Sequence, residues 1–480
     1  MPLLQSFPQL KIIQQIARRR KVAVYLVGGF LRDYFLERPN YDLDFAVSKD
    51  ALKFARIFAN KIRGAYVLLD QERGCARVVR KEKGKIYTFD FADFRAKTFK
   101  LDLAHRDFTI NTLAIDVKSL KDQTEIPDVI LDFKKARPDL LKKIIRLTSV
   151  KAFKDDPLRM LRAFSLKAML GFSIEAATLK QIKKDKDLLR LVSCERVRDE
   201  LFKILETPSA ASTLHAMDRI GLLEKVIPQV HVMYGCEQGG YHHLDVWQHS
   251  LETVAQIENV FEAFKNDTDV MNYIHEPSGG IHSRAALIKL GCLLHDIGKP
   301  ETKKIEGERT TFHGHEHVGK NIVRHVARML KLSTRERHTL ESLVQLHLRP
   351  GYLSNFKNPS ERAIYRYFRD AKDEAVSILL LSLADQYSTR GPWTAPEDIQ
   401  HHEEICFKLI KERFAQAKEK PLARLINGHD LIRTLKLKPS PLFGKILKHV
   451  EENQSLGKIT TKKEALALAK DFYANQKHSH

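Results

Sequence analysis

The chain has 480 residues, 43% of them hydrophobic, which is enough for about two to four domains with buried cores. Its formal net charge of +21 predicts a polyanionic partner such as nucleic acid, although a generally lysine-rich proteome would give the same excess. Five scattered cysteines without a C-x-x-C pair argue against a disulfide framework and a zinc ribbon. Because the longest apolar run is too short to span a bilayer, we expect a cytoplasmic protein without a membrane partner.

The stretch at residues 25–47 reads as a strand, a Gly28-Gly29 turn, a short helix and a second strand. On the second strand Asp42 and Asp44 alternate with apolar residues, so both project from one face. Two carboxylates this close favour a cation between them, and Mg²⁺ binds carboxylates together with phosphate oxygens. Glycines let a phosphate approach the backbone. The stretch therefore predicts a site for Mg²⁺ and a nucleoside triphosphate, although each half alone is more often a plain turn or a solvated strand.

Residues 1–140 alternate strand and helix, with a hairpin expected over residues 77–94. Asp90 on this hairpin is a candidate third carboxylate for the metal, and a surface aspartate is the equal alternative. Downstream, Arg106 could bind a phosphate, and Asp107 and Asn111 could bond ribose hydroxyls. Read alone, this last segment is an ordinary amphipathic one with a capping aspartate.

A helix is expected over residues 154–172, with Asp156 as its N-cap and Gly171 as its stop. The same spacing places the acceptor-only Asp156 beside the donor-only Arg159. Cytosine and adenine show an amino donor beside a ring-nitrogen acceptor, so this pair could bond either base and disfavour uracil and guanine. The helix therefore predicts selection of CTP and ATP, with Arg162 as a further nucleotide contact. In the alternative, Asp156 only caps the helix and the two arginines are solvated.

Five motifs occur in order along the first half of the chain: G-G-x-x-R-D at 28–33, D-L-D at 42–44, R-D-F-T-I-N at 106–111, D-D-P-L-R-M-L-R at 155–162 and E-R-V-R-D-E-L at 195–201. Together they resemble class II tRNA nucleotidyltransferases (CCA-adding enzymes) and bacterial poly(A) polymerases. The resemblance implies an α+β fold, with a polymerase-β-like head of mixed sheet and helices before an all-α neck. It also implies that the Asp pair binds catalytic Mg²⁺ and that the D-x-x-R helix serves as a protein template for the base.

Two positions depart from the family pattern. His105 stands where the family has the first arginine of R-R-D, and the hinge at 131–146 contains no glycine. In the family this hinge is thought to let the site change from C to A addition. Full CCA addition, CC-only, A-only and poly(A) addition therefore all stay open.

Residues 226–398 are expected to be helices rich in histidine, with an H…HD…D pattern that resembles the HD phosphohydrolase superfamily. Imidazole and carboxylate ligands suit a divalent transition metal or Mg²⁺, and an open position would hold a water activated for phosphoester hydrolysis. The candidate ligands are His249, His295, Asp296 and Asp385, with His315 and His347 as candidates for a second metal position.

We expect four parts: a nucleotidyltransferase head at 1–140, a helical neck for nucleobase and RNA at 141–225, an HD-type metal-binding domain at 226–398 and a basic tail for tRNA at 399–480. In the tail Lys436, Lys438, Lys445 and Lys448 are candidate phosphate contacts, and solvated lysines are the equal alternative.

The sequence as a whole predicts template-independent addition of C and/or A from CTP and ATP to the 3′ end of tRNA, with Mg²⁺ in the head. Gly28, Gly29 and Arg32 would contact the phosphates. The rivals are a poly(A) polymerase or a partial CC- or A-adding enzyme, a phosphohydrolase whose head only binds nucleotide, and a non-catalytic RNA-binding protein. The oligomeric state is left open.

Overall fold

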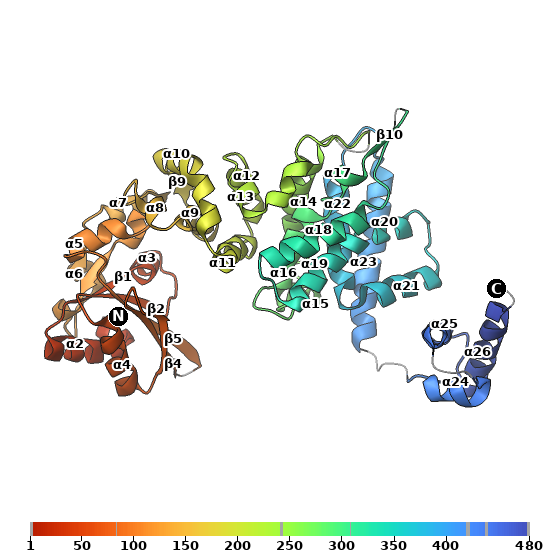
Figure 1. The fold of residues 1–480 in the computed structure, drawn as a ribbon, viewed down its shortest axis with the longest axis horizontal. Coiled ribbons are helices and arrows are strands. Elements are labelled where there is room, and N and C mark those ends of the chain that lie inside the picture. Colours follow the sequence, from red (N-terminus) through yellow and green to blue (C-terminus); the bar gives the residue numbers. More distant parts are fainter. Residues whose placement is uncertain are drawn as a thin grey trace. The chain divides into compact units, whose positions relative to one another are not determined.

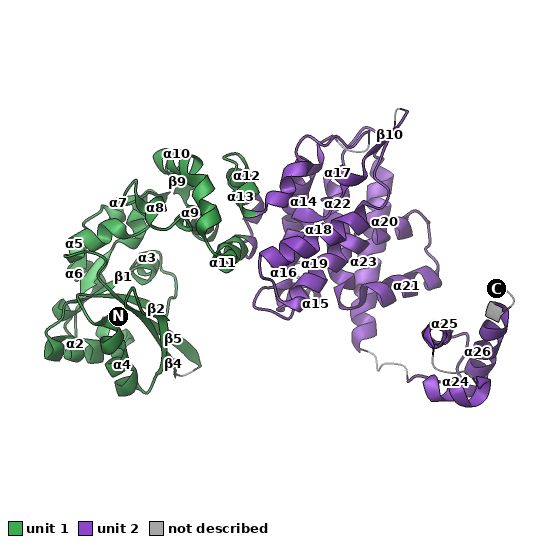
Figure 2. Ribbon diagram, in the orientation of Figure 1, with its two compact units in different colours: residues 1–204, 216–226 green, residues 205–215, 227–480 purple. Residues whose placement is uncertain are grey.

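The computed structural model describes residues 3–82, 84–240, 243–307, 309–418, 423–436 and 440–477, so the predicted phosphate contact Lys438 lies outside the described residues. The chain divides into two compact units, residues 1–204 with 216–226 and residues 205–215 with 227–480 (Figure 2). The first unit contains a mixed sheet with helices, and the second is largely helical (Figure 1). This confirms the predicted α+β fold class with helical domains after the head.

A seven-stranded sheet forms the centre of the first unit, in the order β3-β4-β5-β2-β1-β6-β7. Neighbouring strands are antiparallel except β2 and β5, which run parallel. The hairpin expected over residues 77–94 is present as the antiparallel pair β4 and β5. The strands are β1 Val24–Val27, β2 Asp42–Val47, β3 Ala65–Asp70, β4 Cys75–Glu82, β5 Lys85–Asp93, β6 Ala114–Asp116 and β7 Ile130–Leu131.

Alternation along β2 and β5 gives the sheet one apolar and one acidic face. Phe45 and Phe91 stack with ring centroids 5.0 Å apart, and α4 (Ala51–Ile62) covers them with two further phenylalanines. Burial of each of these rings contributes about 1.5–3 kcal/mol, which holds the two strands firmly together. Asp44 and Asp90, which alternate with the rings, therefore lie on the opposite face.

The helix expected around Asp156 is divided in the structure. α8 (Ala152–Asp155) ends before Asp156, whose backbone is extended, and α9 (Arg159–Leu170) begins after a turn. Pro157 accounts for the break, because proline disfavours helical geometry in the residue before it. Gly171 ends α9 in the left-handed conformation, as the sequence predicts.

The other elements of the first unit surround the sheet or follow it along the chain, with α2 and α4 on the same side of the sheet (Figure 1). They are α1 Leu3–Ser6, α2 Gln9–Arg20, α3 Gly29–Phe35, α5 Phe99–Asp102, α6 Ile126–Val129, α7 Ala136–Leu141, β8 Ile144–Ile145, β9 Ser173–Ile174, α10 Ala176–Asp185, α11 Cys194–Leu205 and α13 Leu223–Val226.

The second unit is a helical bundle around α22 (Ala375–Ser388), whose residues are almost all buried. The long apolar run of the sequence is part of this core helix. No helix among the described residues is long and apolar enough to cross a membrane. The other elements are the first part of α12 (Ala210–Asp218, whose last three residues belong to the first unit), α14 Val246–Ala263, α15 Thr268–His275, α16 Arg284–Leu294, α17 Lys299–Thr302, β10 Lys304–Glu306, β11 Arg309–Thr311, α18 His315–Met329, α19 Thr334–Leu346, α20 Arg349–Ser354, α21 Glu361–Ala371 and α23 Pro396–Lys418.

The last three helices of the second unit, α24 (Gly428–Leu435), α25 (Pro441–Ser455) and α26 (Lys462–Lys477), have a small core of their own. Leu431 and Ile446 are fully buried in it. The basic tail expected from the sequence therefore includes a folded helical segment.

Candidate active site and metal centre

The acidic face of the sheet brings three of the predicted carboxylates together. Asp44 on β2 is the register partner of Asp90 on β5, and Asp42 lies two pairs further along, opposite Thr88. Burial, followed by the charges of Asp42 and Asp90, raises the pKa of Asp44 to about 6. A divalent cation between Asp42 and Asp44 would relieve this repulsion. The residues present therefore fit a metal ion.

The Gly28-Gly29 turn lies directly against this carboxylate pair. Gly28 has φ +84°, and a Cβ atom at this position would lie 2.4 Å from Oδ2 of Asp44. Only glycine therefore permits both the left-handed backbone and the close approach of the turn to Asp44. A phosphate on this turn would lie next to the predicted metal.

Arg32, predicted to contact phosphate, is held behind the turn. Its Nε donates to Oδ1 of Asp33 at 2.8 Å, and its Nη1 donates to Oδ1 of Asn111 at 2.9 Å. The side chain is nearly buried, and it is not among the residues that line the adjacent cavity. In the structure Arg32 joins α3 to the R-D-F-T-I-N segment.

A cavity of about 310 Å³ opens over the acidic face of the sheet. Its walls come from β2, β5, the glycine turn, the segment after α5, the start of α9 and Arg196 of α11, which are far apart in the sequence. Asp42 and Arg32 are not among its lining residues. The predicted residues that line it are Gly28, Gly29, Asp44, Asp90, Arg106, Asp107, Asn111, Asp156, Arg159 and Arg162.

Arg106 provides an unused donor at this cavity. Its Nε is buried and has no hydrogen-bond partner among the described residues, and the nearest ion-pair contact joins its Nη2 to Oδ2 of Asp102 at 3.5 Å. An unsatisfied buried donor is costly, and a phosphate oxygen would satisfy it. This geometry fits the predicted contact between Arg106 and phosphate.

Asp107 organises the neighbouring side chains. Its Oδ2 lies 2.8 Å from Nε of Arg162, and its Oδ1 accepts from Nδ2 of Asn111 at 3.1 Å. Burial alone would raise the pKa of Asp107, but Arg162 and the donated hydrogen bonds hold it below its usual value. Arg162 is thus an ion-pair partner of Asp107, although half of its side chain is exposed.

Asp156 and Arg159 both face the cavity, each fixed by other contacts. Oδ1 of Asp156 accepts from the Leu158 amide at 3.2 Å, and its Oδ2 pairs with Arg196 at 2.7 Å. Nη2 of Arg159 donates to the His105 carbonyl at 2.6 Å. His105 is the position that departs from the family motif, and its backbone carbonyl orients Arg159, the arginine predicted to read the base.

Three arginines that the sequence did not single out complete the surroundings. Arg95 and Arg196 line the cavity, and Arg95 donates to the His105 carbonyl at 3.0 Å. Arg77 binds both oxygens of Asp90, at 2.8 and 2.7 Å, so this third carboxylate is already paired. Arg196 belongs to the E-R-V-R-D-E-L motif, and this motif is the sequence feature from which its place at the cavity could have been predicted.

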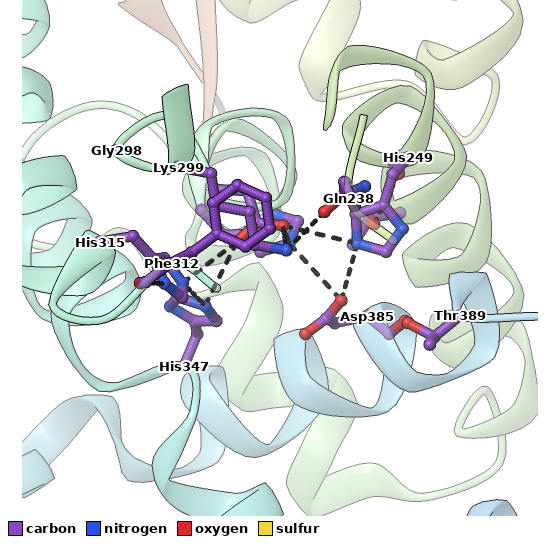
Figure 3. Close-up of polar contacts among 12 residues, drawn as sticks. Gln238, His249, Gly298, Lys299, Phe312, His315, His347, Asp385 and Thr389 are labelled. Carbon is purple, nitrogen blue, oxygen red and sulfur yellow. Dashed lines mark hydrogen bonds and ion pairs between the residues drawn. The ribbon is translucent and has the colours of Figure 1, made fainter. Parts of the chain in front are cut away.

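The predicted HD ligands meet in the core of the second unit (Figure 3). The ligand atoms form two groups of three, each within 4.8 Å: His249 with His295 and Asp385, and Asp296 with His315 and His347. Asp296 joins the groups, because its Oδ2 lies 3.2 Å from Nε2 of His295 and its Oδ1 lies 3.3 Å from Nε2 of His315. This arrangement fits two metal ions that share one carboxylate.

Three of the imidazoles are oriented by the backbone. Nδ1 of His295, His315 and His347 lies 2.8, 2.9 and 2.8 Å from the carbonyl oxygen three residues earlier in each case. A carbonyl only accepts, so Nδ1 carries the proton and Nε2 faces the centre. Burial lowers the pKa of His347 to about 3, so its ring is neutral at pH 7, as a metal ligand must be.

The polar atoms at this centre also fit a metal. Nε2 of His295 is buried and lies 3.2 Å from Oδ2 of Asp296 and 3.5 Å from Oδ1 of Asp385, but neither contact has hydrogen-bond geometry among the described residues. Lys299 lies beside the ligands, with its Nζ 2.6 Å from Oδ2 of Asp296 (Figure 3). Gly298 permits close helix packing here, because a Cβ atom would lie 2.2 Å from the His315 carbonyl oxygen.

Family models match three segments of the chain: "Poly A polymerase head domain" over residues 24–146, "Probable RNA and SrmB- binding site of polymerase A" over 171–233 and "HD domain" over 246–390. The chain is 31% identical to an A-adding tRNA nucleotidyltransferase of Deinococcus radiodurans, with 92% of this chain and 94% of that protein covered. The chain belongs to the tRNA nucleotidyltransferase family. It is therefore an enzyme of the nucleotidyltransferase class, a class that depends on a divalent metal.

A further relative and a solved structure agree with this family assignment. A CC-adding tRNA nucleotidyltransferase of Thermus thermophilus is 29% identical, with 92% of each chain covered. A solved complex of a CCA-adding enzyme with ATP has a TM-score of 0.64 at 20% identity, with 98% of this chain and 96% of that chain covered. The structural likeness extends over nearly the whole fold.

Proposed function

We propose that the first unit adds C and/or A from CTP and ATP to the 3′ end of tRNA without a nucleic-acid template. The observation that carries the proposal is the single cavity that joins Asp44, the Gly28-Gly29 turn and the Asp156 and Arg159 side chains. A carboxylate for the metal, a turn for the phosphates and a pair that reads the base are the parts this reaction requires. The A-adding and CC-adding relatives support C and A as the nucleotides transferred.

In this proposal Asp42 and Asp44 hold Mg²⁺, which supplies charge neutralisation for the triphosphate and for the leaving pyrophosphate. Arg106 offers its unpaired Nε to a phosphate oxygen. Asp107 and Asn111 bond the ribose. The 3′-hydroxyl of the RNA attacks the α-phosphate, and pyrophosphate leaves.

Asp156 and Arg159 select the base. Arg196 and the Leu158 amide fix the carboxylate of Asp156, which keeps spare lone pairs for an amino group. Arg159 donates to two backbone carbonyls, which leaves other N–H groups of its guanidinium for a ring nitrogen. Uracil and guanine present the opposite order and would leave these groups unpaired.

The predicted division of the chain belongs to the same proposal. The head at 1–140 performs the transfer, and the neck at 141–225 and the tail at 399–480 bind RNA through its shape and its phosphates. The charge of +21 supports a polyanionic partner.

The test is to incubate the purified protein with tRNA that ends at the discriminator base, with CTP alone, ATP alone or both, and to sequence the 3′ ends. Addition of C, A or CCA would support the proposal and identify which of the three activities the enzyme has. Long runs of A on unrelated RNA would identify a poly(A) polymerase, and no extension would overturn the proposal.

A second function is favoured by the six candidate ligands that include Asp296: metal-dependent hydrolysis of a phosphoester in the domain at 226–398, with Mg²⁺ or a divalent transition metal. The protein loaded with Mg²⁺, Mn²⁺ or Ni²⁺ should release p-nitrophenol from bis-p-nitrophenyl phosphate. The His295→Ala variant should lose this activity. Equal activity in that variant would show that the centre is not responsible.

A further inference from the structure

Two cavities of the second unit meet at one exposed aromatic side chain. The first, of about 610 Å³, lies against the HD centre and is lined by Asp296, Asp385 and Trp393. The second, of about 600 Å³, lies between α18, α19, α20, α21 and α25. Leu348 and Tyr352 line both cavities. Tyr352 is 56% exposed, so the two cavities form neighbouring parts of one surface.

The two cavities differ in charge. Lys299 is the one lysine or arginine among the described residues that line the first cavity, and it is already paired with Asp296. The second cavity is lined by four cations from different elements: Arg349, Arg369, Lys372 and Lys448. Of its two acids, Asp370 is paired with two of these arginines. Positive charge therefore accumulates on the far side of Tyr352 from the metal centre.

The cationic cavity is fixed by a buried carboxylate. Glu452 on α25 is 3% exposed and accepts hydrogen bonds from Arg362 and Arg366 of α21, with Arg369 3.6 Å away. Three arginines against one carboxylate leave an excess of positive charge at this junction. The ion pairs hold α25, and with it Lys448, against α21.

Aromatic side chains extend from this cavity toward the metal centre. Trp393 is 54% exposed and lines the first cavity, whereas Tyr352 lies between the two. Exposed aromatic rings beside a cationic groove are the usual means by which proteins bind single-stranded nucleic acid, with bases on the rings and phosphates on the cations. None of the four cations of the second cavity lines the first cavity, so a mononucleotide that contacts only the first cavity would not use them.

We propose that the second unit binds the end of a single-stranded RNA, with backbone phosphates in the cationic cavity, a base against Tyr352 and the terminal nucleotide beside Trp393 and the HD centre. Binding of the RNA end does not depend on the proposed second function. Only hydrolysis of the bound end rests on that function. In that function a water oxygen forms the new bond to phosphorus, the ester bond breaks, and the released alkoxide takes the proton. The test below measures binding without hydrolysis, so the two proposals can fail separately.

Trp393 provides a specific signal, because the chain has two tryptophans and the other, Trp247, is fully buried. The full-length protein, in EDTA and without nucleoside triphosphate so that no metal supports hydrolysis, is titrated with a single-stranded RNA that has a 3′-hydroxyl end. The RNA has about five nucleotides, a length typical of such sites. We expect quenching of tryptophan fluorescence that is absent in the Trp393→Phe variant. A nucleoside monophosphate should bind at least about tenfold more weakly, because it lacks the phosphate and stacking contacts.

Variants separate the proposed contacts. Lys372→Gln with Lys448→Gln should weaken RNA binding and reduce the salt dependence by about 0.7 per lost phosphate contact. Lys265→Gln with Lys357→Gln removes the same charge from exposed residues of the second unit that lie outside both cavities and outside the tail, and it should change neither the affinity nor its salt dependence. Tyr352→Ala should weaken binding, whereas Tyr352→Phe should retain it.

Three results would overturn the inference. They are the absence of Trp393 quenching by the RNA, equal affinity for the monophosphate, and equal effects of the cavity variant and the control variant. A circular RNA of the same sequence should not quench, and quenching by it would show that the surface does not select an end.

Discussion

At the scale of single residues, Asp44 sets the pH range in which the head can bind its metal. Its pKa is raised to about 6 by burial and by its acidic neighbours, and the protonated form does not bind a cation. Metal affinity therefore falls as the pH drops through about 6. We expect roughly tenfold weaker Mg²⁺ binding at about pH 5 than at about pH 7.

Isothermal titration with Mg²⁺ in a background in which His295 and Asp296 are both replaced by alanine, which removes a ligand from each metal group, would measure this dependence without the second centre. The Asp44→Asn variant, which has no titrating group at this position, provides the control. Affinity that does not change with pH would contradict the assigned role of Asp44.

Arg159 is the residue on which base selection depends most. Its guanidinium is oriented by the His105 and Ala152 carbonyls and lines the cavity beside Asp156. Arg159→Ala should reduce the preference for CTP and ATP over UTP and GTP by about 5- to 150-fold, which corresponds to about 1–3 kcal/mol. Single-nucleotide kcat/KM values measure the preference, with the exposed Arg190→Ala as a matched control. Unchanged selectivity would refute the template role.

At the scale of elements, the turn between β1 and α3 has to come close to β2. Gly28→Ala would place a methyl group 2.4 Å from Oδ2 of Asp44, in addition to the strain at φ +84°. We expect loss of metal binding and nucleotide addition, with a backbone cost of about 1 kcal/mol.

Gly84→Ala is the matched control for this turn. Gly84 also has a positive φ, +75°, but among the described residues beyond its chain neighbours no atom lies within 4 Å of the added Cβ. It should lose similar stability in thermal unfolding and keep full activity. Equal activity losses in the two variants would show that backbone strain, and not the contact with Asp44, is responsible.

The parts of the site that the sequence predicted are those with local patterns. Alternation on β2 predicted the paired carboxylates, and Gly171 predicted the end of α9. The position of Arg32 could not be predicted, because its partner Asn111 is 79 residues away. The pairing of Arg77 with Asp90 was likewise missed, since it depends on the register of β4 and β5. Contacts of this kind are set by the fold and leave no local pattern.

At the scale of the whole molecule, each of the two units has its own core and its own group of functional side chains. Replacement of His295 and Asp296 by alanine should therefore leave nucleotide addition within about twofold of wild type, as expected for separate sites. Metal analysis should show that bound metal is lost from the second unit. Loss of addition as well would show that the units do not act independently.

The most direct test of the central claim is to sequence the 3′ ends of tRNA incubated with all four nucleoside triphosphates. Wild type is compared with Asp44→Ala and with Asp122→Ala, an exposed aspartate paired with Lys11. We predict that wild type and the Asp122 variant add only C and A, and that Asp44→Ala is at least about a thousandfold slower, since several kcal/mol of metal stabilisation are lost. Incorporation of U or G by wild type, or unimpaired addition by Asp44→Ala, would contradict the account.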